Sequence, residues 1–126
     1  MYEWIRNDAR NPYATLYITN ITLNRSAIEL LDNPSQVMLG VNKEAKEIAI
    51  RPVTPQEIDD LNITNEELYK ISIGKSYGRI ANKGFCMLIC ELFDITLTAE
   101  AGRKFPITYK DAENLLIIEL ARGEIS

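Results

Sequence analysis

The sequence predicts an α+β fold in which two similar strand–strand–helix–hairpin halves, related by pseudo-two-fold symmetry, share one core. Three observations predict it. The same order of elements occurs twice, over residues 13–53 and 69–121. Each half has one short helix whose apolar face it cannot bury alone. The 126 residues, 46% of them hydrophobic, suffice for a single domain, residues 1–126, with one core.

The first half opens with two strands and a short helix. Residues 13–18 are rich in aromatic and β-branched side chains, and a second strand is predicted at 21–23. Apolar side chains within 27–31 then fall on one face of a helix. The predicted cap of this helix is Asn24 or Ser26.

A hairpin completes the first half. Apolar residues alternate over 37–41, which is the spacing of a strand. The charged segment 42–46 is the predicted turn, and 47–51 returns as the partner strand. Pro52 is expected to close that strand, because proline cannot donate to the ladder.

Residues 54–68 are predicted to be a helical connector between the halves. Thr54 and Glu57 have the spacing of a capping box, with Pro55 at the first helical position. Thr64 and Glu67 repeat that spacing. The apolar residues expected to pack on the body are Ile58, Leu61 and Leu68. The acidic residues expected to form a solvated face are Asp59, Asp60, Glu66 and Glu67.

The second half repeats the order of the first. Strands are predicted at 69–73 and 77–81, followed by an apolar helix at 85–93. Residues 104–109 and 114–120 form the second hairpin. The residues that align between the halves are Tyr13 with Tyr69, Asn24-Arg25 with Asn82-Lys83, 29–32 with 91–94, 43–45 with 110–112, and Ile48 and Ile50 with Leu115 and Ile117. The matches are short, so coincidence is the alternative to duplication.

The two halves are expected to bury their apolar faces against each other. The predicted core contains Leu30, Leu31, Val37, Leu39, Ile48, Ile50, Met87, Leu88, Leu92, Ile107, Leu115 and Ile117. The first strand, 13–18, is interpreted as an exposed edge that a second copy could extend, which makes a homodimer plausible.

The composition and net charge make some classes of function less favourable than others. A net charge of −4 opposes a large nucleic-acid footprint, yet 14 Lys and Arg residues remain for a local basic patch. The absence of histidine removes the commonest general base and the commonest zinc ligand. The first residues have no apolar core like that of a signal peptide, so the cytoplasm is the predicted compartment.

The sequence motifs that could indicate catalysis or metal binding are better explained as structural features. Cys86 and Cys90, one helical turn apart in an apolar run, predict core thiols. The alternatives are half of a metal site completed by carboxylates or a second chain, and a catalytic thiol assisted by Lys83. Gly74-Lys75-Ser76 matches the end of a phosphate-binding loop, but a hairpin turn explains it better. We therefore predict no enzyme activity, no metal and no cofactor.

A family resemblance rests on residues 21–53. This segment reads Ile-Thr-Leu-Asn-Arg-Ser-Ala-Ile-Glu-Leu-Leu, then Val-Met-Leu-Gly-Val, then Glu-Ile-Ala-Ile-Arg-Pro-Val. It resembles the swapped-hairpin unit of AbrB-like regulators, a family that includes MazE-type antitoxins and the internally duplicated MraZ proteins. It departs from that unit at Asn24-Arg25, where Pro-Lys is usual, and at Pro34-Ser35-Gln36, where Gly-Asp is usual.

The resemblance implies that this fold is barrel-like, a barrel made of two units. Many family members bind DNA through basic residues near the first strand, the helix start and the barrel face. The matching positions are Arg25 and Arg51, and by duplication Lys83. The full set of candidate DNA-binding residues is Arg25, Arg51, Lys83, Arg79, Lys75, Arg6 and Arg10, with Arg103 and Lys104 also at element ends. The alternative is an ordinary surface on which both signs of charge are mixed.

Two hypotheses about function follow. The first is a non-enzymatic, DNA-associated transcriptional regulator. The second is a protein-interaction module, such as an antitoxin-like or phage and mobile-element accessory protein, which the acidic balance of the chain favours.

Overall fold

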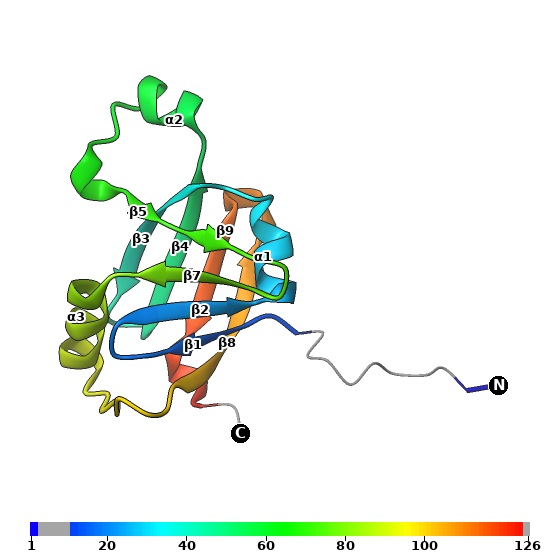
Figure 1. The fold of residues 1–126 in the computed structure, drawn as a ribbon, viewed down its shortest axis with the longest axis vertical. Helices are drawn as coiled ribbons and strands as arrows, with labels where there is room; N and C mark the ends of the chain where they lie inside the picture. The colour runs from blue at the N-terminus through cyan, green and yellow to red at the C-terminus, as the bar shows by residue number, and fades with distance from the viewer. Residues whose placement is uncertain (3–10, 125–126) are drawn as a thin grey trace.

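The computed structural model describes residues 1–2 and 11–124, and these form an antiparallel sheet curled into a nearly closed barrel (Figure 1). The nine strands follow the order β5-β3-β4-β9-β8-β1-β2-β7-β6. The two ends of this order, β5 (Tyr69–Lys70) and β6 (Ser72–Ile73), are separated in sequence only by Ile71. The first and last positions of the sheet are therefore adjacent along the chain, which nearly closes the barrel.

The predicted elements of the first half form close to their predicted boundaries. They are β1 (Tyr13–Leu16), β2 (Asn20–Asn24), α1 (Arg25–Leu31), β3 (Gln36–Asn42) and β4 (Glu47–Val53). Pro52 does not close β4 but lies within it, opposite Val37 of β3.

The predicted strand at 69–73 is split into β5 and β6, which pair with different neighbours, β3 and β7. The other elements match the sequence prediction to within a few residues. They are α2 (Pro55–Asp60), β7 (Tyr77–Ala81), α3 (Lys83–Phe93), β8 (Arg103–Lys110) and β9 (Leu115–Glu119), with short 3-10 turns at Asn65–Glu67, Asp111–Glu113 and Leu120–Arg122.

The prediction that the first strand is an exposed edge is wrong. β1 pairs with β2 on one side and with β8 on the other, so that Thr15 lies opposite both Thr22 and Lys104. Its ladder groups are used on both sides, because closure of the barrel removes the edge. β1 therefore offers no template for a second copy.

The connector stands out from the barrel at α2 (Figure 1). The Thr54 side chain accepts a hydrogen bond from the N–H of Glu57 at 3.1 Å, and the Glu57 carboxylate accepts one from the N–H of Thr54 at 3.0 Å, which is the predicted capping box. Leu61 does not pack on the body as expected but is 56% exposed, whereas Ile58 and Leu68 are half-buried. The four acidic side chains predicted to face solvent are exposed.

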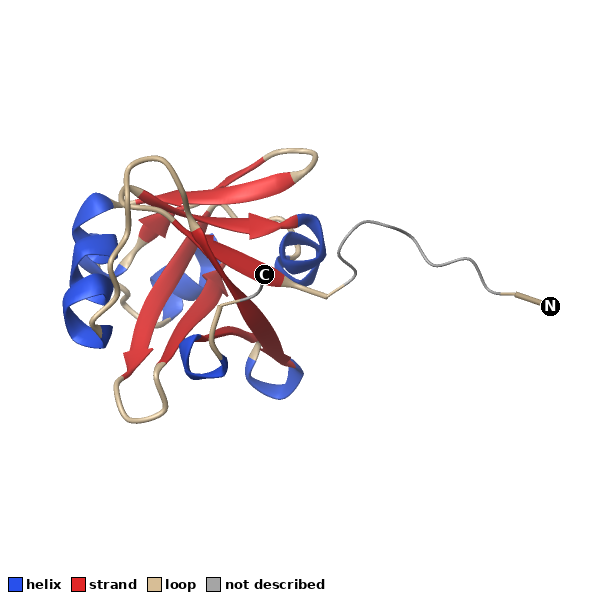
Figure 2. Cartoon of the chain, turned by 90° about the horizontal axis from the view of Figure 1, so that it is seen from below, coloured by secondary structure: helices blue, strands red, loops and turns tan. Residues whose placement is uncertain are grey.

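The core lies inside the barrel and beneath the two main helices, which stand on opposite sides of the strands (Figure 2). Of the predicted core residues, Leu31, Val37, Ile48, Ile50, Ile107 and Ile117 are buried, and Leu30, Leu39, Leu92 and Leu115 are half-buried. Met87 and Leu88 were expected in the core but are 51% and 43% exposed. The reason is the rotation of α3, which buries Phe85, Cys86 and Ile89 instead.

The inward face of β9 also differs from the sequence alignment of the two halves. Leu116 and Ile118 are fully buried and lie opposite Ile50 and Ile48. Leu115, which the alignment matched to Ile48, is half-buried. A shift of one residue moves every side chain of a strand to the other face, so the alignment was out of register here.

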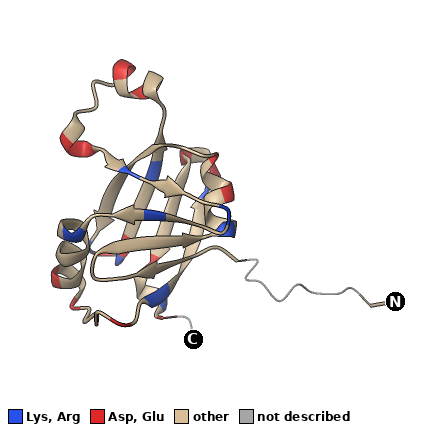
Figure 3. Ribbon diagram, viewed as in Figure 1, with Lys and Arg blue, Asp and Glu red and all other residues tan. Residues whose placement is uncertain are grey.

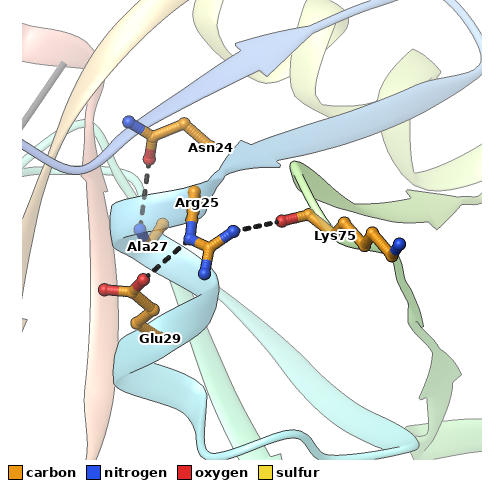
Figure 4. A network of polar contacts seen from close by, with 5 residues as sticks. All are labelled: Asn24, Arg25, Ala27, Glu29 and Lys75. Carbon is orange, nitrogen blue, oxygen red and sulfur yellow. Dashed lines mark hydrogen bonds and ion pairs between the residues drawn. The ribbon is translucent and has the colours of Figure 1, made fainter. Parts of the chain in front are cut away.

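α1 and α3 both begin at an asparagine N-cap. The Asn24 side chain, which caps α1, also forms hydrogen bonds with residues outside the helix. Its side-chain oxygen accepts from the N–H of Ala27 at 3.1 Å (Figure 4). The same oxygen accepts from the N–H of Tyr13 at 3.0 Å, and the side-chain nitrogen donates to the carbonyl of Asn11 at 3.0 Å. Asn82 caps α3 through one bond, from the N–H of Phe85 at 2.9 Å. Of the predicted alternatives, Asn24 is the cap, and Ser26 lies inside the first turn.

We expect Asn24→Ala to lower the free energy of unfolding by about 2 kcal/mol, and Asn82→Ala by about 1 kcal/mol. Both lose a cap, but only Asn24 also joins the start of β1 to the start of α1. Urea denaturation followed by circular dichroism measures both losses. Equal losses would mean that the contacts of Asn24 with Tyr13 and Asn11 contribute nothing.

Candidate functional site

The outer surface of the β2–β7 pair is the strongest candidate site. Side chains alternate between the two faces of each strand. Leu23 and Ile80 are buried inside the barrel, and Thr22 and Arg79, directly opposite each other in the register, point outward. These two strands lie far apart in the sequence, so only the fold places Arg79 beside Thr22.

Two shallow hollows flank Arg79. One, of about 330 Å³, is lined by Tyr17, Asn20, Thr22, Tyr77 and Arg79. The other, of about 610 Å³, is lined by residues 72–77 together with Arg79 and Ala81. Tyr77 and Arg79 line both hollows. We call the β2–β7 face the surface formed by these two residues together with Tyr17, Asn20, Thr22 and Ser72, which each line one hollow. None of the described residues that line the two hollows is acidic.

Arg79 carries an uncompensated positive charge at the centre of this face. Its Nη2 donates to the Tyr77 hydroxyl at 3.4 Å, and its Cζ lies 5.5 Å from the centroid of the same ring. Within the described part of the chain it forms no ion pair. Because a guanidinium has five N–H donors, most of the hydrogen-bonding capacity of Arg79 remains available to a ligand.

Arg25 and Lys75 meet at one end of the face. The Arg25 guanidinium donates from Nη1 to the backbone carbonyl of Lys75 at 2.9 Å and from Nε to Glu29 at 3.0 Å (Figure 4). The contact with Lys75 joins the start of α1 to the turn between β6 and β7. Arg25 is thus partly neutralised and fixes the turn, whereas the exposed ammonium group of Lys75 adds charge beside the hollow it lines.

Lys83 marks the opposite end. It is exposed and is the first residue of α3, which begins where β7 ends. β2 and β7 pair over five residues. At a rise of about 3.3 Å per residue, Arg25 and Lys83 therefore stand roughly 15–20 Å apart, at the two ends of the pair.

The other predicted cations lie elsewhere. Arg51 is on β4, which is far from β2 and β7 in the sheet order, and it forms an ion pair with Glu57 at 3.3 Å. Arg103 pairs with Glu124 at 3.0 Å. Lys104 is closer, because it lies opposite Thr15 of β1, which in turn lies opposite Thr22. Arg6 and Arg10 are outside the described residues.

Most acidic side chains lie outside this face. Figure 3 shows Lys and Arg on β7, on the turn before it and at the start of α3, whereas Asp and Glu gather on the connector and on the helices. The exception is the end formed by Arg25 and Lys75, where Glu29 and Asp32 of the adjoining helix line a hollow with them. A net charge of −4 coexists with a local basic strip because the carboxylates lie mainly elsewhere.

The sequence analysis missed the neutral members of the face, Tyr17, Asn20, Thr22, Ser72 and Tyr77. They are not basic, so a search for phosphate-binding cations could not find them. The alternation Tyr77-Gly78-Arg79-Ile80-Ala81 was a usable signal, because it places Tyr77 and Arg79 on one side of the strand.

The cysteines and the lysine-containing turn show no sign of chemistry. Burial, and then the neighbouring Cys90, raises the pKa of Cys86 to about 11, and burial also raises the pKa of Cys90. Lys83 is exposed while Cys86 is buried. Gly74-Lys75-Ser76 is the turn between β6 and β7, as predicted, with the N–H of Gly74 donating to the carbonyl of Tyr77 at 2.9 Å.

Glu119 belongs to a small polar cluster outside the β2–β7 face. The hydroxyl of Thr108 donates to Glu119 at 2.6 Å, and this bond, together with Arg122 at 3.1 Å, lowers the pKa of that carboxyl. This arrangement satisfies the carboxylate and leaves no role for it as an acid near neutral pH. In the part of the chain that the structure describes, no three His, Cys, Asp or Glu residues come together as metal ligands.

Comparison with known proteins found no match that bears on the function of this chain. No protein-family model matches this chain, and no curated protein or solved structure is similar to it. None of the described helices has the length and hydropathy needed to cross a membrane.

Proposed function

We propose that this chain is a non-enzymatic, DNA-associated regulator that binds duplex DNA through the β2–β7 face. The observation that carries the proposal is the position of Arg79, which forms no ion pair among the described residues and is flanked by hollows without acidic residues. Lys75 and Arg25 lie at one end of the face and Lys83 at the other. Phosphate binding requires such a basic strip, and the neutral hydroxyl and amide groups beside it add hydrogen bonds.

The spacing of the end cations fits a duplex. The major groove of B-DNA is about 12 Å wide and accepts a two-stranded β-ribbon. With roughly 15–20 Å between them, Arg25 and Lys83 reach phosphates on both sides of the groove. Arg79, midway between them, is then the residue placed to contact a base edge.

We further propose that the chain is an internal duplication of an AbrB-like unit. Two observations support this. Each half contributes strands, then one helix, then a hairpin, with β5, β6 and β7 of the second half in the place of β1 and β2 of the first. The pairing is also reciprocal, because β1 pairs with β8 of the second half, and β3 of the first half pairs with β5 of the second. β2–β7 and β4–β9 also join strands at equivalent positions in the two halves, which is the pairing that a pseudo-two-fold axis would require.

Fluorescence anisotropy of a labelled mixed-sequence duplex tests the proposal. Three phosphate contacts, by Arg25, Lys75 and Lys83, predict that affinity falls about sixfold between about 50 and 100 mM salt. We expect Lys75→Glu to weaken binding by a further tenfold or so. The backbone carbonyl of Lys75 still accepts from Arg25 in this variant, so the turn is retained.

Lys43→Glu is the matched control. Lys43 is also an exposed lysine between two antiparallel strands, β3 and β4, and its replacement changes the net charge equally. If Lys43→Glu weakens binding as much as Lys75→Glu, attraction is diffuse and the β2–β7 face is not the site. Absence of binding at the lower salt concentration would overturn the proposal.

A protein-interaction module remains the second candidate function. The observation that favours it is the exposure of Met87 and Leu88, two large apolar side chains on one helix. Most other aliphatic residues of the described chain are buried or half-buried, so an exposed pair on one helix marks a contact surface.

A further inference from the structure

The outer side of α3 has the pattern of a contact helix. Its buried side consists of Phe85, Cys86 and Ile89. At 3.6 residues per turn, the exposed residues of the helix fall within an arc of about 140° on the opposite side. These residues, which we call the α3 outer face, are Lys83, Gly84, Met87, Leu88 and Glu91. Figures 1 and 2 show α3 at the margin of the barrel, where this side has no neighbouring element.

A mostly apolar hollow adjoins the α3 outer face. It has a volume of about 380 Å³, and Met87 and Glu91 belong to both. Its other lining residues include Ile18, Ile95 and Leu97, which come from the loops on either side of the helix. A side chain the size of leucine, delivered by a helix packed on α3, would bury apolar surface here.

The charges on the α3 outer face are arranged for self-pairing. Lys83 lies four residues before Met87 and Glu91 four residues after it. When two copies of the helix pack antiparallel about Met87, each Lys83 faces Glu91 of the other copy. A parallel arrangement would oppose like charges. Gly84 contributes no side chain, and the nearest atom to a Cβ built there is the side-chain oxygen of Asn82 at 3.5 Å, so backbones can approach closely.

We propose that α3 is a homodimer interface, in which it packs antiparallel against α3 of a second copy. Met87 and Leu88 of each copy pack against the same two residues of the other copy near the two-fold axis. The contact is isologous, as expected for a two-fold dimer, because each residue pair occurs twice. The apolar side chains provide the attraction, while Lys83 and Glu91 select the antiparallel orientation. Lys83 belongs both to this interface and to the proposed DNA-binding face, whereas Met87, Leu88 and Glu91 belong to the interface alone.

Sedimentation velocity of the full chain, over concentrations up to about 10⁻⁴ M, tests the proposal. We expect a monomer–dimer equilibrium whose Kd rises more than about tenfold in Leu88→Asp. Leu61→Asp is the matched control, because Leu61 is an exposed leucine on the connector, away from α3, and its replacement should leave the Kd unchanged. Circular dichroism verifies that each variant is folded.

Charge reversal provides a second test that does not alter apolar surface. Lys83→Glu and Glu91→Lys are each expected to raise the Kd about fivefold, because each opposes like charges at two sites. The double variant should restore the Kd to within about twofold. The proposed interface is overturned if the chain stays monomeric or if Leu88→Asp leaves the Kd of the dimer unchanged. It is also overturned if the Kd of the double variant does not return toward that of the unsubstituted chain. Sedimentation is measured without DNA, so these outcomes test the interface alone, and DNA binding is measured separately on the Lys75 and Lys43 variants.

Discussion

Leu116→Ala is expected to lower the free energy of unfolding by about 3–4 kcal/mol, and Leu115→Ala by about 1 kcal/mol. The two leucines are neighbours on β9 and lose the same atoms. Leu116 is fully buried and lies opposite Ile50 inside the barrel, so its removal leaves a cavity. Leu115 is half-buried and pairs with Lys110 near the end of the hairpin, where water can fill the space.

Urea denaturation of both variants, monitored by tyrosine fluorescence and circular dichroism, gives the two losses. Their difference measures the register of β9 directly, since a shift by one residue would exchange the two values. Equal losses would contradict the assignment of Leu116 to the inner face. The m-values should be unchanged, because neither replacement alters the surface exposed on unfolding by much.

Cys86 is expected to react with iodoacetamide at least about 100-fold more slowly in the folded protein than in the unfolded chain at neutral pH. The attacking species is the thiolate, and burial raises the pKa of Cys86 from 9.0 to about 11, which lowers its thiolate fraction about 100-fold. The remaining 4% exposure of the side chain slows the reaction further. Mass spectrometry after a labelling pulse separates Cys86 from Cys90, because tandem fragmentation places the label.

The same raised pKa predicts an alkaline loss of stability. Below pH 9 the thiol is neutral in both states, and its contribution is fully present. Between pH 9 and pH 11 the unfolded chain ionises while the folded protein does not, so up to about 3 kcal/mol is lost as pH rises. Cys86→Ala should be less stable at neutral pH yet show a flatter profile over this range. A profile as steep as that of the unsubstituted protein would show that Cys86 is not responsible.

Local patterns in the sequence determined most of the secondary structure of this protein. The cap at Asn24, the capping box at Thr54 and the turn at 74–76 each involve residues within a few positions of one another. Short-range hydrogen bonds and side-chain spacing therefore suffice to locate them. The order of strands and helices followed from the same information, and so did the expectation of an α+β fold, whereas its barrel-like form was implied by the family resemblance.

Only the tertiary structure decided which faces point inward and which strands are neighbours. Residues 115–118 are an unbroken apolar run, so no alternation distinguishes the inner face of β9 until β4 pairs with it. α3 is apolar over most of its circumference, and its contact with the barrel determines that Met87 and Leu88 face outward. Likewise, closure of the barrel places β8 beside β1 and removes the expected edge.

For the candidate site, too, the sequence identified individual residues, and only the tertiary structure showed which of them lie together. The sequence identified Arg25, Lys75, Arg79 and Lys83 as cations at element ends, because charge and turn signals are local. Whether cations converge depends on pairing between strands distant in sequence, and this brings Lys75 and Arg25 to one end of the β2–β7 pair while leaving Arg51 on another side of the barrel. Side-chain chemistry is thus encoded residue by residue, but a surface exists only once hydrogen-bonded strands and buried apolar faces have fixed its members together.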